Sequence, residues 1–193
     1  MRLQAVRILV AVALVSPVAA CAAAAEAPPA TRPTTGPSDR LVKHLGRETV
    51  DVLSRADRGE AFRVGTVDPE KAGTDATVGG RLLPADAKPV PLPKEAFERL
   101  RTALLSDDAY FRADSKGTKT GVGYRLRTPA GETVEVSYCV AKGNVWVVTK
   151  DASGKVLAKG DRRGFRDDKA SPLRTIAAEL FPADADVQAY RPK

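Results

Sequence analysis

The chain has 193 residues, 43% of them hydrophobic, which is enough for one domain with a hydrophobic core and too few for two large ones. The formal net charge is +7, and Lys and Arg alternate with Asp and Glu along the chain. Nucleic-acid-binding domains usually gather their basic residues on one face, so we expect no nucleic-acid partner and keep polyanion binding as an alternative.

The first 20 residues have the pattern of a secretory signal peptide. Arg2 and Arg7 make the start basic, residues 8–15 are apolar, and small residues follow. The apolar run is too short to span a membrane stably. The sequence therefore predicts export, with residues 1–20 removed.

Residues 18–21, Val-Ala-Ala-Cys, resemble a bacterial lipobox, in which a small-residue motif precedes the cysteine that is lipidated. The resemblance implies that Cys21 becomes a lipidated N-terminus and anchors the protein to a membrane. Residue 22 is Ala, which implies the outer membrane, on its periplasmic side, if the cell has two membranes. The alternative is ordinary cleavage after the alanines at 23–25, which would discard Cys21.

Residues 22–37 contain almost only Ala, Pro, Thr and Gly and predict a flexible tether. Ser38 is a candidate N-cap for a helix that runs to about Arg55, with apolar residues at helical spacing. His44, the one histidine, lies on the other face of this helix without partners for a metal or catalytic site, and we interpret it as solvated.

The middle of the chain is less regular. Residues 61–67 alternate as a strand, whereas 68–93 have no sustained period apart from a short strand at 80–83. Pro93 then begins a second helix, whose apolar side carries Phe97, Leu100, Leu104 and Leu105.

Residues 121–159 predict a four-stranded antiparallel meander. Val122, Tyr124 and Leu126 alternate with Arg125 and Arg127, and the three strands that follow are separated by turn signals at 128–131, 142–144 and 151–154. A third helix begins at Ser171-Pro172 and ends near 181, and residues 183–193 resemble a tail. We therefore predict a single α+β domain over 38–182, with a sheet of four to five strands packed on one face by about three helices.

The span 61–182 resembles a group of uncharacterised bacterial α+β domains. The likeness rests on the helix at 98–105, Tyr110, the strands at 121–127 and 134–139, and a closing Leu-Phe-Pro at 180–182. Similar domains often carry a second Cys three residues after the position of Cys139, where this chain has Lys142. The resemblance implies no activity.

One face of the meander is a candidate binding patch, composed of Arg125, Arg127, Glu135, Cys139 and Trp146. In the simplest hairpin register these side chains lie together, and a mixture of a large aromatic with guanidinium groups is typical of an interface centre. Cys139 is either a packing residue, a nucleophile, or a site for an intermolecular disulfide or metal. Trp146 is either exposed in this patch or part of the core.

No motif for a catalytic residue, cofactor or metal is recognisable, and we expect none of these. The sequence favours a membrane-tethered lipoprotein of the cell envelope that acts as a binding or structural module, with a protein, peptide or glycan as partner. A small envelope enzyme with an unrecognised site is the alternative.

Overall fold

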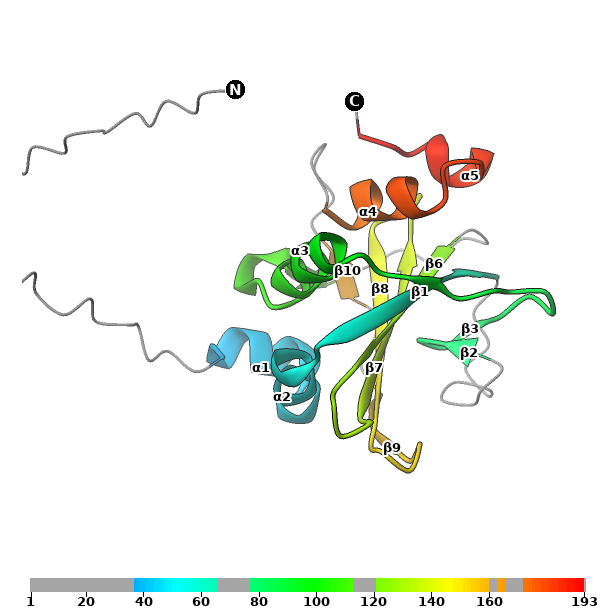
Figure 1. The fold of residues 1–193 in the computed structure, drawn as a ribbon. Helices are drawn as coiled ribbons and strands as arrows, with labels where there is room; N and C mark the ends of the chain where they lie inside the picture. Colours follow the sequence, from blue (N-terminus) through cyan, green and yellow to red (C-terminus); the bar gives the residue numbers. More distant parts are fainter. Residues whose placement is uncertain (1–36, 66–76, 113–120, 160–162, 166–171, 193) are drawn as a thin grey trace, which may run out of the picture. The chain divides into compact units, whose positions relative to one another are not determined.

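The computed structural model describes residues 37–65, 77–112, 121–159, 163–165 and 172–192 (Figure 1). These residues belong to one compact unit, which spans Thr35–Lys193. The predicted signal peptide, Cys21 and nearly all of the predicted tether lie outside them, as does Ser171.

The described residues of this unit form an eight-stranded antiparallel sheet. Seven strands follow one another in the order β4-β1-β6-β7-β8-β10-β5, and β9 pairs with β8. The strands are β1 (Arg58–Val64), β4 (Val90–Pro91), β5 (Tyr110–Arg112), β6 (Gly121–Arg127), β7 (Thr133–Cys139), β8 (Asn144–Lys150), β9 (Val156–Lys159) and β10 (Arg163–Phe165). The predicted meander corresponds to β6 to β9, and the α+β fold class is confirmed.

The helices pack against one face of this sheet. They are α1 (Asp39–Leu45), α2 (Arg47–Arg55), α3 (Lys94–Leu104), α4 (Pro172–Leu180) and the short α5 (Ala185–Gln188), with a 3-10 turn, η1, at Asp107–Ala109. Their apolar residues join those of the alternate sheet positions in one core, which contains Leu53, Leu100 and Ile176 from helices and Tyr124 and Val136 from strands.

Buried hydrogen bonds fix this helical layer on the sheet. The Tyr124 hydroxyl donates to the backbone oxygen of Leu173 at 3.1 Å, and the hydroxyls of Thr49 and Thr149 lie 2.8 Å apart. Burial raises the pKa of the Tyr124 phenol well above its ordinary value, so the hydroxyl keeps its proton for this bond.

A two-stranded hairpin lies on the opposite face. It consists of β2 (Thr77–Val78) and β3 (Arg81–Leu82), and Figure 1 shows it on the side of the sheet away from α1, α2 and α3. Val78 forms a small apolar cluster there with Phe62 and Val64 of β1. The sheet is thus covered by helices on one face and in part by this hairpin on the other.

Two sequence-based expectations for helices need correction. The predicted helix 38–55 is broken at Gly46, whose φ of 85° ends α1 before α2 begins. Ser38 caps α1 as expected, because its hydroxyl accepts a hydrogen bond from the backbone nitrogen of Leu41 at 3.2 Å. The expected tail contains α5, because Asp184 accepts a hydrogen bond from the backbone nitrogen of Val187, and the Val187 side chain is buried in the core.

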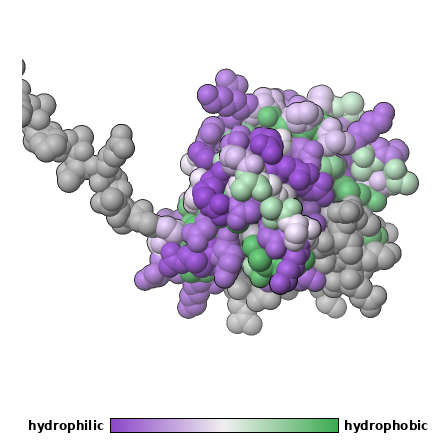
Figure 2. Space-filling view, turned by 60° about the horizontal axis from the view of Figure 1, so that its bottom comes forward, coloured by the Kyte–Doolittle hydropathy of each residue, from purple (hydrophilic) through white to green (hydrophobic). Residues whose placement is uncertain are grey.

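The surface offers few large apolar residues. Figure 2 shows a face that is mainly hydrophilic, with hydrophobic residues in small groups. Among the described residues, the exposed large hydrophobic side chains are Leu157 and Tyr190. Scattered residues of this kind are normal for a protein surface, so a polar site is the better candidate for function.

Candidate binding site on the polar face of the sheet

Five charged side chains gather on the sheet face opposite the helices. We call this group the polar-face cluster, and it consists of Glu60, Arg125, Arg127, Glu135 and Lys150. Arg125 stands directly opposite Glu135 on β7 and Glu60 on β1. Since alternate residues of a strand share a face, Arg127 and Lys150 join them there. Arg125 and Glu135, both predicted to lie on this face, are cross-strand partners.

Glu135 is the centre of the cluster. Its side chain is 1% exposed, and its Oε1 accepts hydrogen bonds from Arg125 Nε at 2.9 Å and from Lys150 Nζ at 3.0 Å. Its Oε2 accepts from the backbone nitrogen of Gly79 at 3.3 Å. A carboxylate so deeply buried is tolerated only when it is paired and hydrogen-bonded, and these three donors meet that requirement.

Glu60 links the two arginines at the edge of the cluster. Its Oε1 accepts from Arg125 Nη1 at 3.4 Å and from Arg127 Nη2 at 3.1 Å. The Arg125 guanidinium also lies over the Phe62 ring, 5.1 Å from its centroid, in cation–π geometry. Arg125 is therefore held on three sides, whereas Arg127 is held at one end and is 38% exposed.

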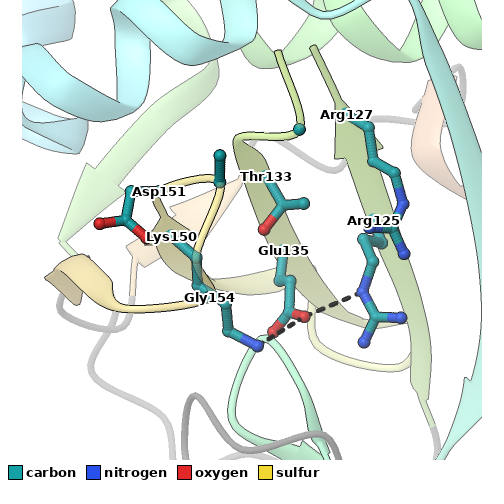
Figure 3. Close-up of a pocket in the computed structure, with 9 residues that line it drawn as sticks. Arg125, Arg127, Thr133, Glu135, Lys150, Asp151 and Gly154 are labelled. Atoms are coloured by element: carbon teal, nitrogen blue, oxygen red, sulfur yellow. Dashed lines mark hydrogen bonds and ion pairs between the residues drawn. The ribbon is translucent and has the colours of Figure 1, made fainter. Parts of the chain in front are cut away.

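A cavity of about 150 Å³ opens between these residues and the turn that joins β8 to β9. Figure 3 shows Arg125 and Lys150 converging on Glu135, with Arg127 beside Arg125. The other lining residues come from turns and strand ends: Gly131, Thr133, Asp151, Ala152 and Gly154. The lining is mainly polar, so we call it the polar cavity.

Asp151 forms one wall of the polar cavity. A hydrogen bond from the Ser153 hydroxyl, followed by backbone hydrogen bonds from residues 155 and 153, holds the pKa of Asp151 below its ordinary value. Asp151 is therefore ionised at neutral pH and holds the turn in shape. Asp151 accepts these hydrogen bonds from neutral donors within its own turn, so its negative charge stays in the wall of the cavity.

A second cavity, of about 300 Å³, lies beside the first. It is lined by Arg58, Gly59, Glu60, Pro91, Leu92 and Arg127. Pro91 and Leu92, at the end of the edge strand β4, make it less polar than its neighbour, and we call it the edge cavity. Arg127 lines both cavities.

The structure separates the five residues predicted for the patch into two groups. Arg125, Arg127 and Glu135 line the polar cavity, whereas Cys139 and Trp146 share the same face but are not among the lining residues. Cys139 is fully buried opposite Asn144, and Trp146 is half-buried opposite Ser137. His44, interpreted as solvated, is half-buried and stacks on the Tyr110 ring on the helical side.

Sequence reasoning missed Glu60 and Lys150. Lys150 follows Trp146 and Val148 at steps of two, so the same alternation placed it on the patch. Glu60 precedes Phe62 at the same step in β1, but the predicted strand began one residue too late to include it. The hairpin contact from Gly79 could not be found in this way, because it depends on tertiary packing.

The described residues offer charged side chains and hydrogen-bond donors on the polar face. Within the described ranges, no group of His, Cys, Asp and Glu side chains is arranged to hold a metal ion. The polar-face cluster contains three cations and two carboxylates, so its formal charge is +1, and its guanidinium groups can form charge-assisted hydrogen bonds.

Comparison with models of protein families finds no family that matches the chain. Comparisons with curated proteins and with solved structures find no match either. No helix in the described part of the chain is long and apolar enough to cross a membrane.

Proposed function

We propose that this protein is an exported lipoprotein, tethered to a membrane of the cell envelope through Cys21, and that its domain is a binding module. The proposed binding surface is the polar face of the sheet. The observation that carries the proposal is the convergence of Arg125, Arg127 and Lys150 on a cavity of about 150 Å³ at a face without covering helices. The alternatives, an envelope enzyme or a polyanion-binding module, have less support from the described residues.

The lipid anchor accounts for the N-terminal sequence. A basic start, a short apolar run and the Val-Ala-Ala-Cys motif fit export and lipidation, and the Ala/Pro/Thr-rich segment up to residue 37 fits a tether that holds the domain away from the membrane. A lipid chain and a flexible tether leave the domain free to meet a partner, which is the geometry that a binding module needs.

The anchor is tested by replacing Cys21 with serine. Because serine has no thiol to acylate, C21S is expected to leave the detergent phase in a phase-partition experiment, whereas the natural protein enters it. Labelling with radioactive fatty acid is expected only for the natural protein. Equal partition and equal labelling of the two would eliminate the lipoprotein proposal.

The binding surface is tested by site-specific photo-crosslinking in the producing cells. A photo-reactive residue at Ala152, on the exposed rim of the polar cavity, is expected to give a discrete adduct. The control position is Lys43, which is exposed on α1. An adduct from Lys43 but none from Ala152 would place the partner on another face and refute the proposed surface.

A further inference from the structure

The polar cavity and the edge cavity meet at Arg127, and this arrangement indicates what the proposed binding surface recognises. The inference rests on the proposed function and concerns its ligand. Arg127 lines both cavities, and its guanidinium is fixed at one end by the hydrogen bond from Nη2 to Glu60 at 3.1 Å. A ligand that contacts Arg127 can therefore place one group in each cavity.

The balance of charges favours an anionic group in the polar cavity, because three cations line it against the two carboxylates of Glu135 and Asp151. Both oxygens of Glu135 already accept hydrogen bonds, and the side chain is 1% exposed, so it presents almost no acceptor to a ligand. Guanidinium and ammonium groups carry several N–H donors and no acceptor. Among the described residues, Arg127 uses one terminal nitrogen on Glu60 and keeps the rest of its planar fork for a ligand oxygen.

A carboxylate matches this donor set best. An arginine fork binds a carboxylate through two parallel hydrogen bonds, and the charges of Arg125 and Lys150 behind Arg127 add attraction without needing direct contact. The volume of the polar cavity also suits a carboxylate, because about 150 Å³ holds a small charged group but no folded segment.

The edge cavity supplies the other half of the recognition. Its volume of about 300 Å³ and the contribution of Pro91 and Leu92 suit an apolar side chain. Arg58 and Glu60 border it with opposite charges, so the apolar part of a ligand would lie between charged rims. The described surface has no large apolar patch next to it that would favour a broad hydrophobic interface.

We propose that the polar face binds an extended peptide segment of a partner protein, with a carboxylate on Arg127 in the polar cavity and an adjacent apolar side chain in the edge cavity. The carboxylate belongs either to a C-terminus or to an acidic side chain. Both sources present the same group to the arginine fork, and the experiment separates them.

The test measures binding of three short peptides to the full chain in detergent by NMR titration. The first is acetyl-Ala-Ala-Ala-Leu with a free C-terminal carboxylate, the second is the same peptide as its C-terminal amide, and the third is acetyl-Ala-Leu-Glu-Ala amide. The first or the third is expected to bind at least about tenfold more tightly than the second, a ratio typical of one charge-assisted contact. Whichever binds more tightly identifies the source of the carboxylate.

Variants then assign the contact. Arg127→Ala is expected to remove the preference for carboxylate over amide, and Arg127→Lys to restore only part of it, because lysine keeps the charge but not the fork. Arg99→Ala is the matched control, since Arg99 is a surface arginine that pairs with Glu179 on the helical side. It is expected to leave the preference unchanged. Equal unfolding midpoints of these variants would show that the fold is intact.

Some outcomes would overturn the inference. Equal affinity for all three peptides, a preference for a carboxylate peptide that survives Arg127→Ala, or inorganic phosphate that binds as tightly as the peptides would each exclude a peptide carboxylate as the ligand. If the Ala152 adduct forms while the peptides show no preference, only this inference fails. If neither the adduct nor peptide binding is found, the proposed binding surface fails with it.

Discussion

Replacing Glu135 with alanine is expected to lower the free energy of unfolding by about 3–5 kcal/mol. The change removes the carboxylate that accepts from Arg125 and Lys150, whose side chains are only 15% and 7% exposed. It leaves Lys150 without the anion that compensates it, Arg125 with only the longer contact to Glu60 at 3.4 Å, and the backbone nitrogen of Gly79 without its acceptor. Chemical denaturation of the purified protein, followed by circular dichroism, measures the loss.

Two control variants distinguish the effect of an unpaired buried charge on stability from the effect of losing an exposed ion pair. Glu179→Gln breaks the ion pair with Arg99, in which both side chains are 45% exposed, and is expected to cost no more than about 1 kcal/mol. The triple variant Glu135→Leu, Arg125→Met, Lys150→Met replaces all three charges with apolar groups. It is expected to recover much of the stability that Glu135→Ala loses, because no unpaired charge remains.

A small loss on Glu135→Ala, within about 1 kcal/mol, would contradict this view of the cluster. It would mean that water or movement of the side chains compensates Arg125 and Lys150, and that the pairs are no more than surface ion pairs. The triple variant also bears on function: if it is stable yet gives no adduct at Ala152, the charges serve binding rather than folding.

The strands of the meander and the faces of their side chains could be predicted from the sequence, because alternation sets which residues share a face and turn residues set roughly where the chain reverses. The observed pairing of Arg125 with Glu135, and of Glu135 with Val148, agrees with the predicted faces. The residues of the polar face could therefore be predicted, apart from Glu60 and Lys150. Glu60 lies one residue before the predicted strand 61–67, and Lys150 was not included in the predicted patch. The exact register could not be predicted, because β8 begins at Asn144, inside the predicted turn 142–144.

The remaining strands could not be predicted because they are short and depend on tertiary contacts. β5 and β10 have three residues each and pair mainly with each other and with the start of β8. No periodic pattern can be established over so short a run. The size of the polar cavity was equally inaccessible, since it depends on how the turn between β8 and β9 lies over the sheet.

The hairpin β2–β3 left a signal that was misinterpreted. Gly79 and Gly80 both have positive φ, 53° and 76°, between two short strands, which is the pattern of a two-residue primed turn. Sequence reasoning predicted a short strand at 80–83 in an otherwise irregular segment, because the flanking strands have two residues each. It did not find the hairpin, nor the hydrogen bonds that join Gly79 to Glu135 and Ser137.

Replacing Gly79 with alanine is expected to cost about 2–5 kcal/mol of unfolding free energy. A Cβ atom there would overlap the backbone nitrogen of Ser137 and lie 2.9 Å from the carbonyl carbon of Val136 and 3.0 Å from the carbonyl oxygen of Trp146. Backbone atoms of a central strand cannot move aside, so overpacking adds about 1–3 kcal/mol to the roughly 1–2 kcal/mol cost of a left-handed alanine. Denaturant unfolding monitored by Trp146 fluorescence measures the sum.

Gly154→Ala is the matched control, because Gly154 also has a positive φ, 86°, but a Cβ atom there would meet nothing within 4 Å. Gly154→Ala is expected to lower the free energy of unfolding only by the cost of placing alanine in a left-handed conformation, about 1–2 kcal/mol. The excess of Gly79→Ala over Gly154→Ala then measures how closely the hairpin approaches β7. Release of the hairpin would also uncover the sheet face that Trp146 shares with Ser137, so the Trp146 emission of the folded variant is expected to shift to longer wavelength. Equal costs for the two substitutions, with unchanged emission, would show that the hairpin is not seated against the polar face.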